Sequence, residues 1–176
     1  GVVRDPSSWY PIELATTAFG QGVSLTPIQL VAAVNSLAND GVRVAPYVVS
    51  QIVTPDGKTI DIKHEGRQRT VSAVAAKTVT SMMVNAVEFG EAKWTKIKGY
   101  KIAGKTGTAQ IPVAGHYDPN QTVASFVGFF PPSKPKITML VLLNHPRTSI
   151  YGSDTAAPIF FNIARDLIKY YNLPPE

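Results

Sequence analysis

The strongest constraint on the fold is a succession of three strand-like segments in the second half of the chain. Residues 100–111 read YKIAGKTGTAQI, residues 122–130 read TVASFVGFF and residues 137–144 read ITMLVLLN. The last two segments are joined by the short polar stretch PPSKPK. Strands linked by short turns pair in the antiparallel sense, because a parallel pair needs a long crossover. The sequence therefore predicts an antiparallel meander of three strands between residues 100 and 144.

Three segments have the apolar spacing of amphipathic helices, namely residues 26–41, 72–90 and 155–171. Thr26 and Ser72 are suitable N-cap residues, and Gly41 and Gly90 suit the C-terminal ends. The spacing predicts three buried faces. They consist of Ile28, Val31, Val34, Leu37 and Ala38 in the first helix, Val79, Met82, Met83 and Ala86 in the second, and Phe160, Ile163, Ala164, Leu167, Ile168 and Tyr171 in the third.

Residues 47–63 alternate between apolar and polar side chains around the turn signal Pro55-Asp56-Gly57, which predicts a β-hairpin. The order of elements is then helix, hairpin, helix, three strands and a closing helix. We therefore expect an α/β (α+β) sandwich, with an antiparallel sheet flanked by helices. No internal repeat divides the 176 residues, which are the length of one domain.

Composition excludes several classes of site. The chain has no cysteine, so it has neither disulfides nor thiolate metal sites. His64, His116 and His145 lie far apart, without the spacing of metal ligands or of a catalytic triad, and we expect them at the surface with no metal or cofactor. The net charge of +5 is mild, and the basic stretch KWTKIKGYK is too short to indicate nucleic-acid binding.

The hydropathy of the chain and its first residues bear on membrane insertion and on processing. No apolar run reaches the roughly 18 residues of a membrane span. The chain opens with GVVRDPSSWY, which contains neither an initiator methionine nor a signal peptide. We therefore expect a fragment or a processed chain.

Residues 99–110, GYKIAGKTGTAQ, fit two incompatible motifs. Residues 99–106 match the phosphate-binding pattern G-x-x-x-x-G-K-[ST], which requires an apolar strand before the loop and a helix after it. Here KWTKIK precedes the motif and is too polar for a buried strand, and GTAQIPV follows it, with Gly107 and Pro112 disfavouring a helix. The sequence therefore predicts no nucleotide site.

Residues 105–108, K-T-G-T, match a motif of penicillin-recognising enzymes, where K-T-G accompanies S-x-x-K. A lysine and two threonine hydroxyls on one face of a strand can bind a carboxylate through charge-assisted hydrogen bonds, and we expect Lys105, Thr106 and Thr108 to share that face. The intervening glycine allows a substrate backbone to approach, and a following backbone N–H can stabilise an oxyanion. Because three-residue matches are common, the motif alone fits a simple strand end with a solvated lysine equally well.

The neighbouring segments distinguish these alternatives. Residues 17–49, TAFGQGVSLTPIQLVAAVNSLANDGVRVAPYVV, resemble a stretch of class B penicillin-binding proteins, the monofunctional D,D-transpeptidases that cross-link peptidoglycan. The segments IAGKTGTAQ, SFVGFFP and APIFFNIARDL follow in that family's order. The resemblance implies the transpeptidase fold related to serine β-lactamases, with peptidoglycan stem peptides as substrates, β-lactam antibiotics as inhibitors and no cofactor. It also implies cell-wall synthesis partners in division or in cell-shape maintenance, and an extracytoplasmic location on the bacterial plasma membrane through an N-terminal anchor.

The resemblance assigns roles to individual residues. It implies that Lys105 supports proton movement and the local positive field, and that Thr106 and Thr108 bind the carboxylate of a substrate or β-lactam. The backbone N–H of Thr108 corresponds to one oxyanion donor, and Gly107 permits close approach. Residues 111–122 form the loop expected after the motif strand, so His116 and Tyr117 are candidates for the rim of the cleft. Tyr151, with Gly152 before the last helix, is a further candidate for the site.

The family pattern is incomplete in this chain. Both S-x-x-K and S-x-N precede K-T-G in the family, whereas Ser133-Lys134-Pro135-Lys136 follows it in a proline-rich turn, and residues 36–39 contain one residue too many for S-x-N. We therefore interpret residues 1–176 as the C-terminal portion of one transpeptidase domain, inactive without its N-terminal remainder. The alternatives for the parent protein are a catalytically silent relative used in sensing or scaffolding, or a β-lactamase.

Overall fold

The computed structural model describes residues 1, 5–18, 20–64, 66–113 and 116–176, without the side chains of residues 6, 112, 113 and 116–119. Its helical elements are η1 (Pro6–Ser8), α1 (Pro11–Ala18), α2 (Pro27–Ala38), α3 (Ala73–Phe89), η2 (Lys93–Thr95) and α4 (Ala156–Tyr170). Its strands are β1 (Val42–Arg43), β2 (Gln51–Val53), β3 (Thr59–Asp61), β4 (Gln68–Arg69), β5 (Ala103–Val113), β6 (His116–Phe130) and β7 (Ile137–Asn144). The mixture of helices and antiparallel sheets confirms the predicted fold class.

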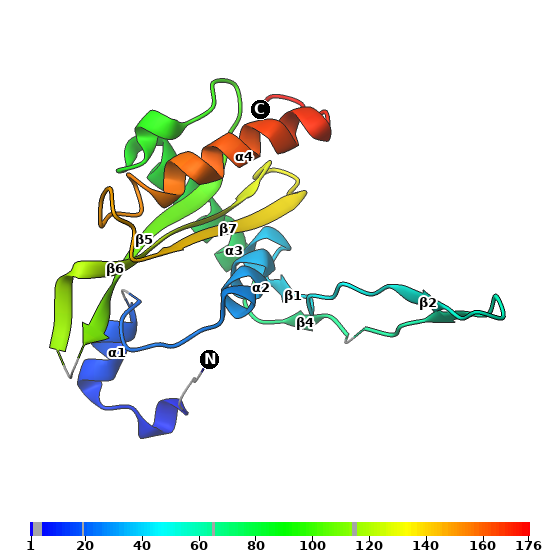
Figure 1. Cartoon of the computed structure of the whole chain (residues 1–176), viewed down its shortest axis with the longest axis horizontal. Coiled ribbons are helices and arrows are strands. Elements are labelled where there is room, and N and C mark those ends of the chain that lie inside the picture. The colour runs from blue at the N-terminus through cyan, green and yellow to red at the C-terminus, as the bar shows by residue number, and fades with distance from the viewer. Residues whose placement is uncertain (2–4, 19, 65, 114–115) are drawn as a thin grey trace.

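Strands β5, β6 and β7 form the central sheet in that order, and each pair is antiparallel (Figure 1). Phe126 of β6 pairs with Thr106 of β5 on one side and with Val141 of β7 on the other. Paired residues of neighbouring strands share a face of the sheet, and that face alternates along each strand. The predicted meander is confirmed, and β5, which carries the K-T-G-T motif, is an edge strand of this sheet.

Helix α4 covers one face of the sheet and closes the main core against it (Figure 1). Phe160 and Phe161 of α4 contact Phe126, with ring centroids 4.6 Å and 5.3 Å apart, and Phe160 also contacts Phe130 at 6.2 Å. All four rings are at most 1% exposed. Edge-to-face arrangements of this kind add to the hydrophobic contribution of the buried rings. This aromatic cluster fixes the position of α4 on β6.

Helix α2 lies on the opposite face, where the Thr138 hydroxyl of β7 donates a hydrogen bond to Asn35 of α2 at 2.9 Å. Helix α3 packs along β5 and against α2. The predicted helix starts are confirmed. Thr26 caps α2 in a reciprocal pair of hydrogen bonds with Gln29, and the Ser72 side chain accepts the backbone N–H of Ala75 at the start of α3.

Several residues of the predicted buried faces are exposed, and these predictions were wrong. Ile28 is 54% exposed, Met82 62%, Ile163 40% and Tyr171 57%. In α4 the reason is local, because the adjacent Phe160 and Phe161 are both buried and the apolar stripe continues through Ala164 and Ile168. That stripe is rotated away from Ile163. In α2, the apolar turn around Ile28 lines a hollow instead of contacting the sheet.

The predicted loop at residues 111–122 is also wrong for the backbone that the structure describes. Strand β5 continues to Val113 and β6 begins at His116, so that Ile111 pairs with Asp118 after a register shift between Gln110 and Ile111. The two strands therefore extend beyond β7 as a long hairpin (Figure 1). A register shift is typical of a β-bulge, which bends a strand and increases its local twist.

Two elements lie outside the core. Strands β2 and β3 form the predicted hairpin, which extends far from the body of the molecule (Figure 1), and all six of its strand residues are exposed. Helix α1, which was not predicted, has no buried residue. In the part of the chain that the structure describes, no helix combines the length and apolarity needed to cross a membrane.

Candidate active site

The K-T-G-T motif lies within strand β5, and its register fixes which side chains point together. Lys105 pairs with Val127, Thr106 with Phe126, Gly107 with Ser125 and Thr108 with Ala124. Because side chains alternate, Thr106 and Thr108 share the face of the sheet that α4 covers, while Lys105 points to the opposite face. The prediction that all three side chains share one face is therefore wrong for Lys105. Residues 103–113 are strand, and no helix begins at Thr106. The structure therefore excludes the phosphate-loop interpretation.

The Lys105 side chain is exposed, and it turns back along the strand. Its ammonium group donates hydrogen bonds to the backbone carbonyl of Thr106 at 3.1 Å and to the Thr106 hydroxyl at 3.0 Å. The positive charge therefore lies beside one of the two threonine hydroxyls of the motif. An anion that accepted a hydrogen bond from this hydroxyl would also be close to the ammonium group, which strengthens such a contact.

Thr108 is held by the segment that leads into α4. The Gly152 backbone N–H donates to the Thr108 hydroxyl oxygen at 3.1 Å, so this oxygen keeps its own proton free to donate to another group. Gly152 is buried, and a Cβ atom there would lie 2.5 Å from the carbonyl oxygens of both Gly107 and Ser125. Only glycine can approach the two strands this closely. The contact places residues 151–153 against the motif.

Gly107 has a packing role inside the sheet. A Cβ atom at Gly107 would lie 2.5 Å from the hydroxyl oxygen of Ser125, its cross-strand partner. A side chain at this position would therefore displace the Ser125 side chain. The sequence argument assigned Gly107 only to the approach of a substrate backbone, and the structure adds this steric requirement.

A small hollow of about 180 Å³ adjoins the motif. Gly104, Lys105 and Thr106 of β5 line one side of it, and Gly90, Glu91 and Ala92 line the other. The Thr106 hydroxyl donates across this space to a carboxylate oxygen of Glu91 at 3.4 Å. Residues 90–92 follow α3, so the end of this helix forms the second wall beside the motif.

The remaining predicted residues differ in how close the structure places them to the motif. Tyr151 is 55% exposed and directly precedes Gly152, whose backbone N–H contacts the Thr108 hydroxyl. The backbone of Tyr117 pairs with Pro112 near the end of the β5–β6 hairpin, but the side chains of His116 and Tyr117 lie outside the described residues. Ser133 is exposed in the connection between β6 and β7, away from any helix start.

Two histidines are exposed, as expected. His64 stacks on Tyr47 with ring centroids 3.5 Å apart, beside the β2–β3 hairpin, and His145 follows β7. Across the described ranges, no three His, Cys, Asp or Glu residues gather in a way that could hold a metal ion.

Sequence reasoning did not identify Glu91, and it identified Gly152 only as a neighbour of Tyr151. The only local signal for Gly152 is a glycine shortly before a helix, which usually indicates a turn. For Glu91 there is no local signal, because its contact with Thr106 joins residues 15 positions apart in sequence. Both residues reach the motif because the C-terminal end of α3 and the segment before α4 lie next to β5.

Comparison with known proteins identifies relatives over nearly the whole chain. Residues 1–165 match the family model of the penicillin binding protein transpeptidase domain. Stage V sporulation protein D of Bacillus subtilis is 37% identical over 169 residues, which cover 94% of this chain and 26% of that protein. A probable peptidoglycan D,D-transpeptidase of Neisseria gonorrhoeae, PenA, is 32% identical over 177 residues, covering 99% of this chain and 29% of the relative. The chain therefore spans less than a third of the length of these relatives.

Solved structures agree in fold as well as in sequence. The crystal structure of penicillin binding protein 3 from Mycobacterium tuberculosis, complexed with ampicillin, superimposes with a TM-score of 0.90 at 33% identity. The match covers 100% of this chain and 41% of the solved one. The agreement of the family model, the sequence relatives and the backbone leads to one conclusion, that this chain belongs to the penicillin-binding protein transpeptidase family, in the class B branch.

Proposed function

We propose that the full-length protein containing this chain is a D,D-transpeptidase that cross-links peptidoglycan stem peptides by serine acyl transfer. The observation that carries the proposal is the K-T-G-T motif on the edge strand β5, with the Thr106 and Thr108 hydroxyls on one face and the Lys105 ammonium 3.0 Å from the first hydroxyl. Relatives named as peptidoglycan D,D-transpeptidases support it. So does the ampicillin complex of the solved M. tuberculosis protein, which supports β-lactams as inhibitors.

In this proposal, an activated serine hydroxyl attacks a peptide carbonyl of the stem peptide, and the peptide bond breaks once the oxyanion collapses. The released amine leaves with a proton, and the amine of a second stem peptide then attacks the acyl-enzyme ester. Thr106 and Thr108 hold the carboxylate of the donor, and Lys105 supplies the positive field and assists proton movement. The backbone N–H of Thr108 contributes one donor to the oxyanion. Gly107 and the exposed Tyr151 border the donor, and we place Tyr117 at the far rim.

We assign the nucleophile to a part of the protein that precedes this chain. Among residues 1–176, S-x-x-K occurs only at residues 133–136, in the exposed connection between β6 and β7. The proposed partners are thus the N-terminal remainder of the transpeptidase domain and other cell-wall synthesis proteins, at the extracytoplasmic face of the plasma membrane. On its own this chain should form no covalent adduct with a fluorescent penicillin in mass spectrometry. An adduct on Ser133 would refute the assignment.

Donor-dependent acylation of the full-length protein tests the roles of the threonines. Thr106→Val removes a hydroxyl while nearly preserving shape, and a hydrogen bond to a charged group contributes about 1.5–3 kcal/mol. Acylation by a carboxylate-bearing β-lactam should slow about ten- to a hundredfold, whereas an uncharged acyl donor should react almost normally. Thr108→Val should do the same but also lower the melting temperature, because it leaves the Gly152 N–H without its acceptor.

Two further variants complete this experiment. Lys105→Ala should reduce acylation more than either valine variant, because it removes a charge that acts on both binding and proton transfer. Thr59→Val, at an exposed position in β3, is the matched control and should leave acylation unchanged. Equally small losses with both donor types in all three motif variants would mean that these residues only stabilise the strand. A wild-type protein that takes up no penicillin, despite an intact fold, would favour a silent relative used in sensing or scaffolding.

A further inference from the structure

Glu91 holds a carboxylate against the proposed binding site for the donor's carboxylate. The Thr106 hydroxyl donates to Glu91 Oε2 at 3.4 Å, and it accepts from the Lys105 ammonium at 3.0 Å. These contacts form a chain from the lysine through the threonine to the glutamate. Nothing in the motif itself requires an acidic residue here, because Glu91 lies in the connection between α3 and η2.

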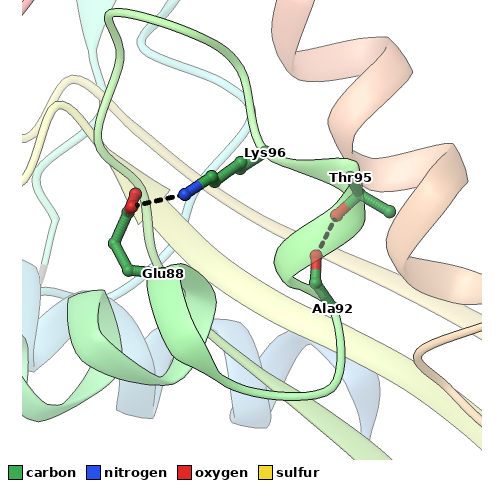
Figure 2. A network of polar contacts seen from close by, with 4 residues as sticks. All are labelled: Glu88, Ala92, Thr95 and Lys96. Carbon is green, nitrogen blue, oxygen red and sulfur yellow. Dashed lines mark hydrogen bonds and ion pairs between the residues drawn. The ribbon is translucent and has the colours of Figure 1, made fainter.

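The backbone around Glu91 is fixed although its side chain is exposed. Gly90 closes α3 with its N–H on the Ala86 carbonyl, and any Cβ at Gly90 would collide with that same carbonyl. Ala92 is 2% exposed and belongs to the main core. Figure 2 shows the surrounding turn, in which Lys96 donates to Glu88 at 3.1 Å and the Thr95 hydroxyl donates to the Ala92 carbonyl at 2.7 Å. Glu91 therefore projects from an anchored position.

The hollow between Glu91 and β5 leaves room for a competing group. Its volume of about 180 Å³ corresponds to roughly six water molecules at about 30 Å³ each, which is enough for a carboxylate and part of its hydration. A donor carboxylate that reaches Thr106 from this side enters the space that the Glu91 carboxylate borders.

The chemistry of the hydroxyl makes the two carboxylates exclusive. A threonine hydroxyl has one proton to donate, and its oxygen otherwise offers only lone pairs. While the proton is directed to Glu91, a donor carboxylate meets lone pairs and a second negative charge. To bind the Thr106 hydroxyl, the donor carboxylate must displace the Glu91 carboxylate. Two carboxylates that share one hydroxyl are close enough for their negative charges to repel each other.

We propose that Glu91 is a positioning residue that occupies the Thr106 hydroxyl and lowers the reactivity of the site toward acyl donors with a free carboxylate. This inference rests on the proposed role of Thr106 in donor binding. It adds a determinant of donor preference that acts through Thr106 without touching the reacting carbonyl. It makes Glu91 an internal competitor of the donor, so its removal increases activity toward one donor class only.

The test compares acylation rates in the full-length protein for Glu91→Gln, Glu91→Ala and the wild type. With a carboxylate-bearing β-lactam, both variants should react about five- to tenfold faster, because the repulsion between two nearby exposed charges disappears. With an uncharged acyl donor, the rates should stay within about twofold of the wild type. The gain should appear in the concentration dependence of acylation more than in its maximal rate. It should shrink as salt is raised, because exposed charges are screened.

Two further variants separate this inference from the proposed function. Glu88→Gln removes the same charge at a position paired with Lys96, and it should not change donor preference. In the Thr106→Val background, Glu91→Gln should give a smaller gain, because only the charge repulsion remains once the hydroxyl for which Glu91 competes is absent. If Thr106→Val slows the carboxylate donor but Glu91→Gln does not accelerate it, the inference about Glu91 is wrong and the proposed function stands.

The other outcomes are equally decisive. If Glu91→Gln slows both donor types, Glu91 supports the site and does not compete with the donor, which overturns the inference. If neither Thr106→Val nor Thr108→Val changes the reaction with the carboxylate donor, the proposed role of the motif fails, and the inference fails with it. A gain that is equal for Glu88→Gln and Glu91→Gln would indicate a general charge effect and would also overturn the inference.

Discussion

Residues 102–168 and residues 5–71 differ in how they use their apolar side chains. In the first region, Phe126, Phe129 and Phe160 are at most 1% exposed, because β6 lies between α4 on one face and α2 on the other. In the second region, Ile12 and Leu14 of α1 are 68% and 65% exposed, and Val48 near the β2–β3 hairpin is 99% exposed. Both regions contain large apolar side chains. Only in residues 102–168 does another helix or strand cover those side chains.

This difference has a physical explanation in the order of elements. Strands β5, β6 and β7 are consecutive and α4 follows directly, so each element meets its partner within a short length of chain. The β2–β3 hairpin has only two short strands, and an isolated two-stranded hairpin is marginally stable in water. We expect the apolar surface of residues 5–71 to contact other parts of the full-length protein, since the relatives are more than three times as long as their match to this chain.

The largest expected effect tests whether burial by a covering element sets the contribution of a phenylalanine, with a buried ring in residues 102–168 and an exposed ring at the end of α3, outside both regions. Phe160→Ala removes a ring that is 0% exposed, and buried Phe to Ala changes typically cost about 3–5 kcal/mol of the free energy of unfolding. Phe89→Ala, at the 77% exposed end of α3, should cost less than about 0.5 kcal/mol. Urea unfolding monitored by circular dichroism measures both. Similar losses would mean that Phe89 is covered in the assembled protein.

A smaller effect tests the contact between the segment before α4 and the motif strand. Gly152→Ala would bring Cβ within 2.5 Å of two backbone carbonyl oxygens, and such overpacking typically costs about 1–3 kcal/mol. The same variant should slow acylation by a carboxylate donor, because the clash moves the backbone N–H of residue 152 away from the Thr108 hydroxyl that it orients. Gly66→Ala is the matched control in the exposed region, where nothing lies within 4 Å of the new Cβ. Thermal melts that gave equal shifts for both variants would contradict this account of the site.

The smallest effect concerns the turn at the N-terminal end of the exposed region. The side-chain hydroxyl and the backbone N–H of Ser7 both donate to Asp5, at 2.7 Å and 2.8 Å, and they lower the pKa of Asp5 below its usual value of 3.8. A lowered pKa in the folded state means that this turn is stabilised above the unfolded pKa and loses that stabilisation as the pH falls through the folded one. A carboxyl titration by nuclear magnetic resonance measures the shift.

Ser7→Ala provides the control for that titration. It removes the hydroxyl donor, which is the largest cause of the shift, and should move the pKa of Asp5 back toward its usual value. The midpoint of global unfolding should change little at any pH, because Asp5 lies outside the core. An Asp5 pKa that did not respond to this substitution would mean that the turn does not persist in solution.

Local sequence signals identified the elements whose determinants are close in the chain. Thr26-Pro27 and Ser72 start α2 and α3 as expected, because a cap needs only the next three residues. Pro55-Asp56-Gly57 forms the tip of the predicted hairpin for the same reason. The meander was equally accessible, since its strands are consecutive and one of its connections is a short polar turn.

What sequence periodicity could not determine was the rotation of each helix against its neighbour. The spacing predicted that Ile163 of α4 is buried, yet Phe161 is buried and Ile163 is 40% exposed, because Phe160 and Phe161 both pack on Phe126. The β5–β6 hairpin is a second case, in which residues 111–113 and 116–118, expected to belong to a loop, continue the pairing after a register shift. Cross-strand pairing overrides local propensity there, as is common in sheets.

In the candidate site, too, some features follow from local sequence and others only from tertiary packing. The sequence alone determined that Lys105, Thr106, Gly107 and Thr108 belong to one strand with both hydroxyls on one face, because strand alternation is a local property. Only the tertiary structure placed Gly152 on the Thr108 hydroxyl and Glu91 on the Thr106 hydroxyl. Those contacts join residues 44 and 15 positions apart. No local pattern encodes such distances, because they are set by where α3 ends and α4 begins once both helices are packed on the sheet.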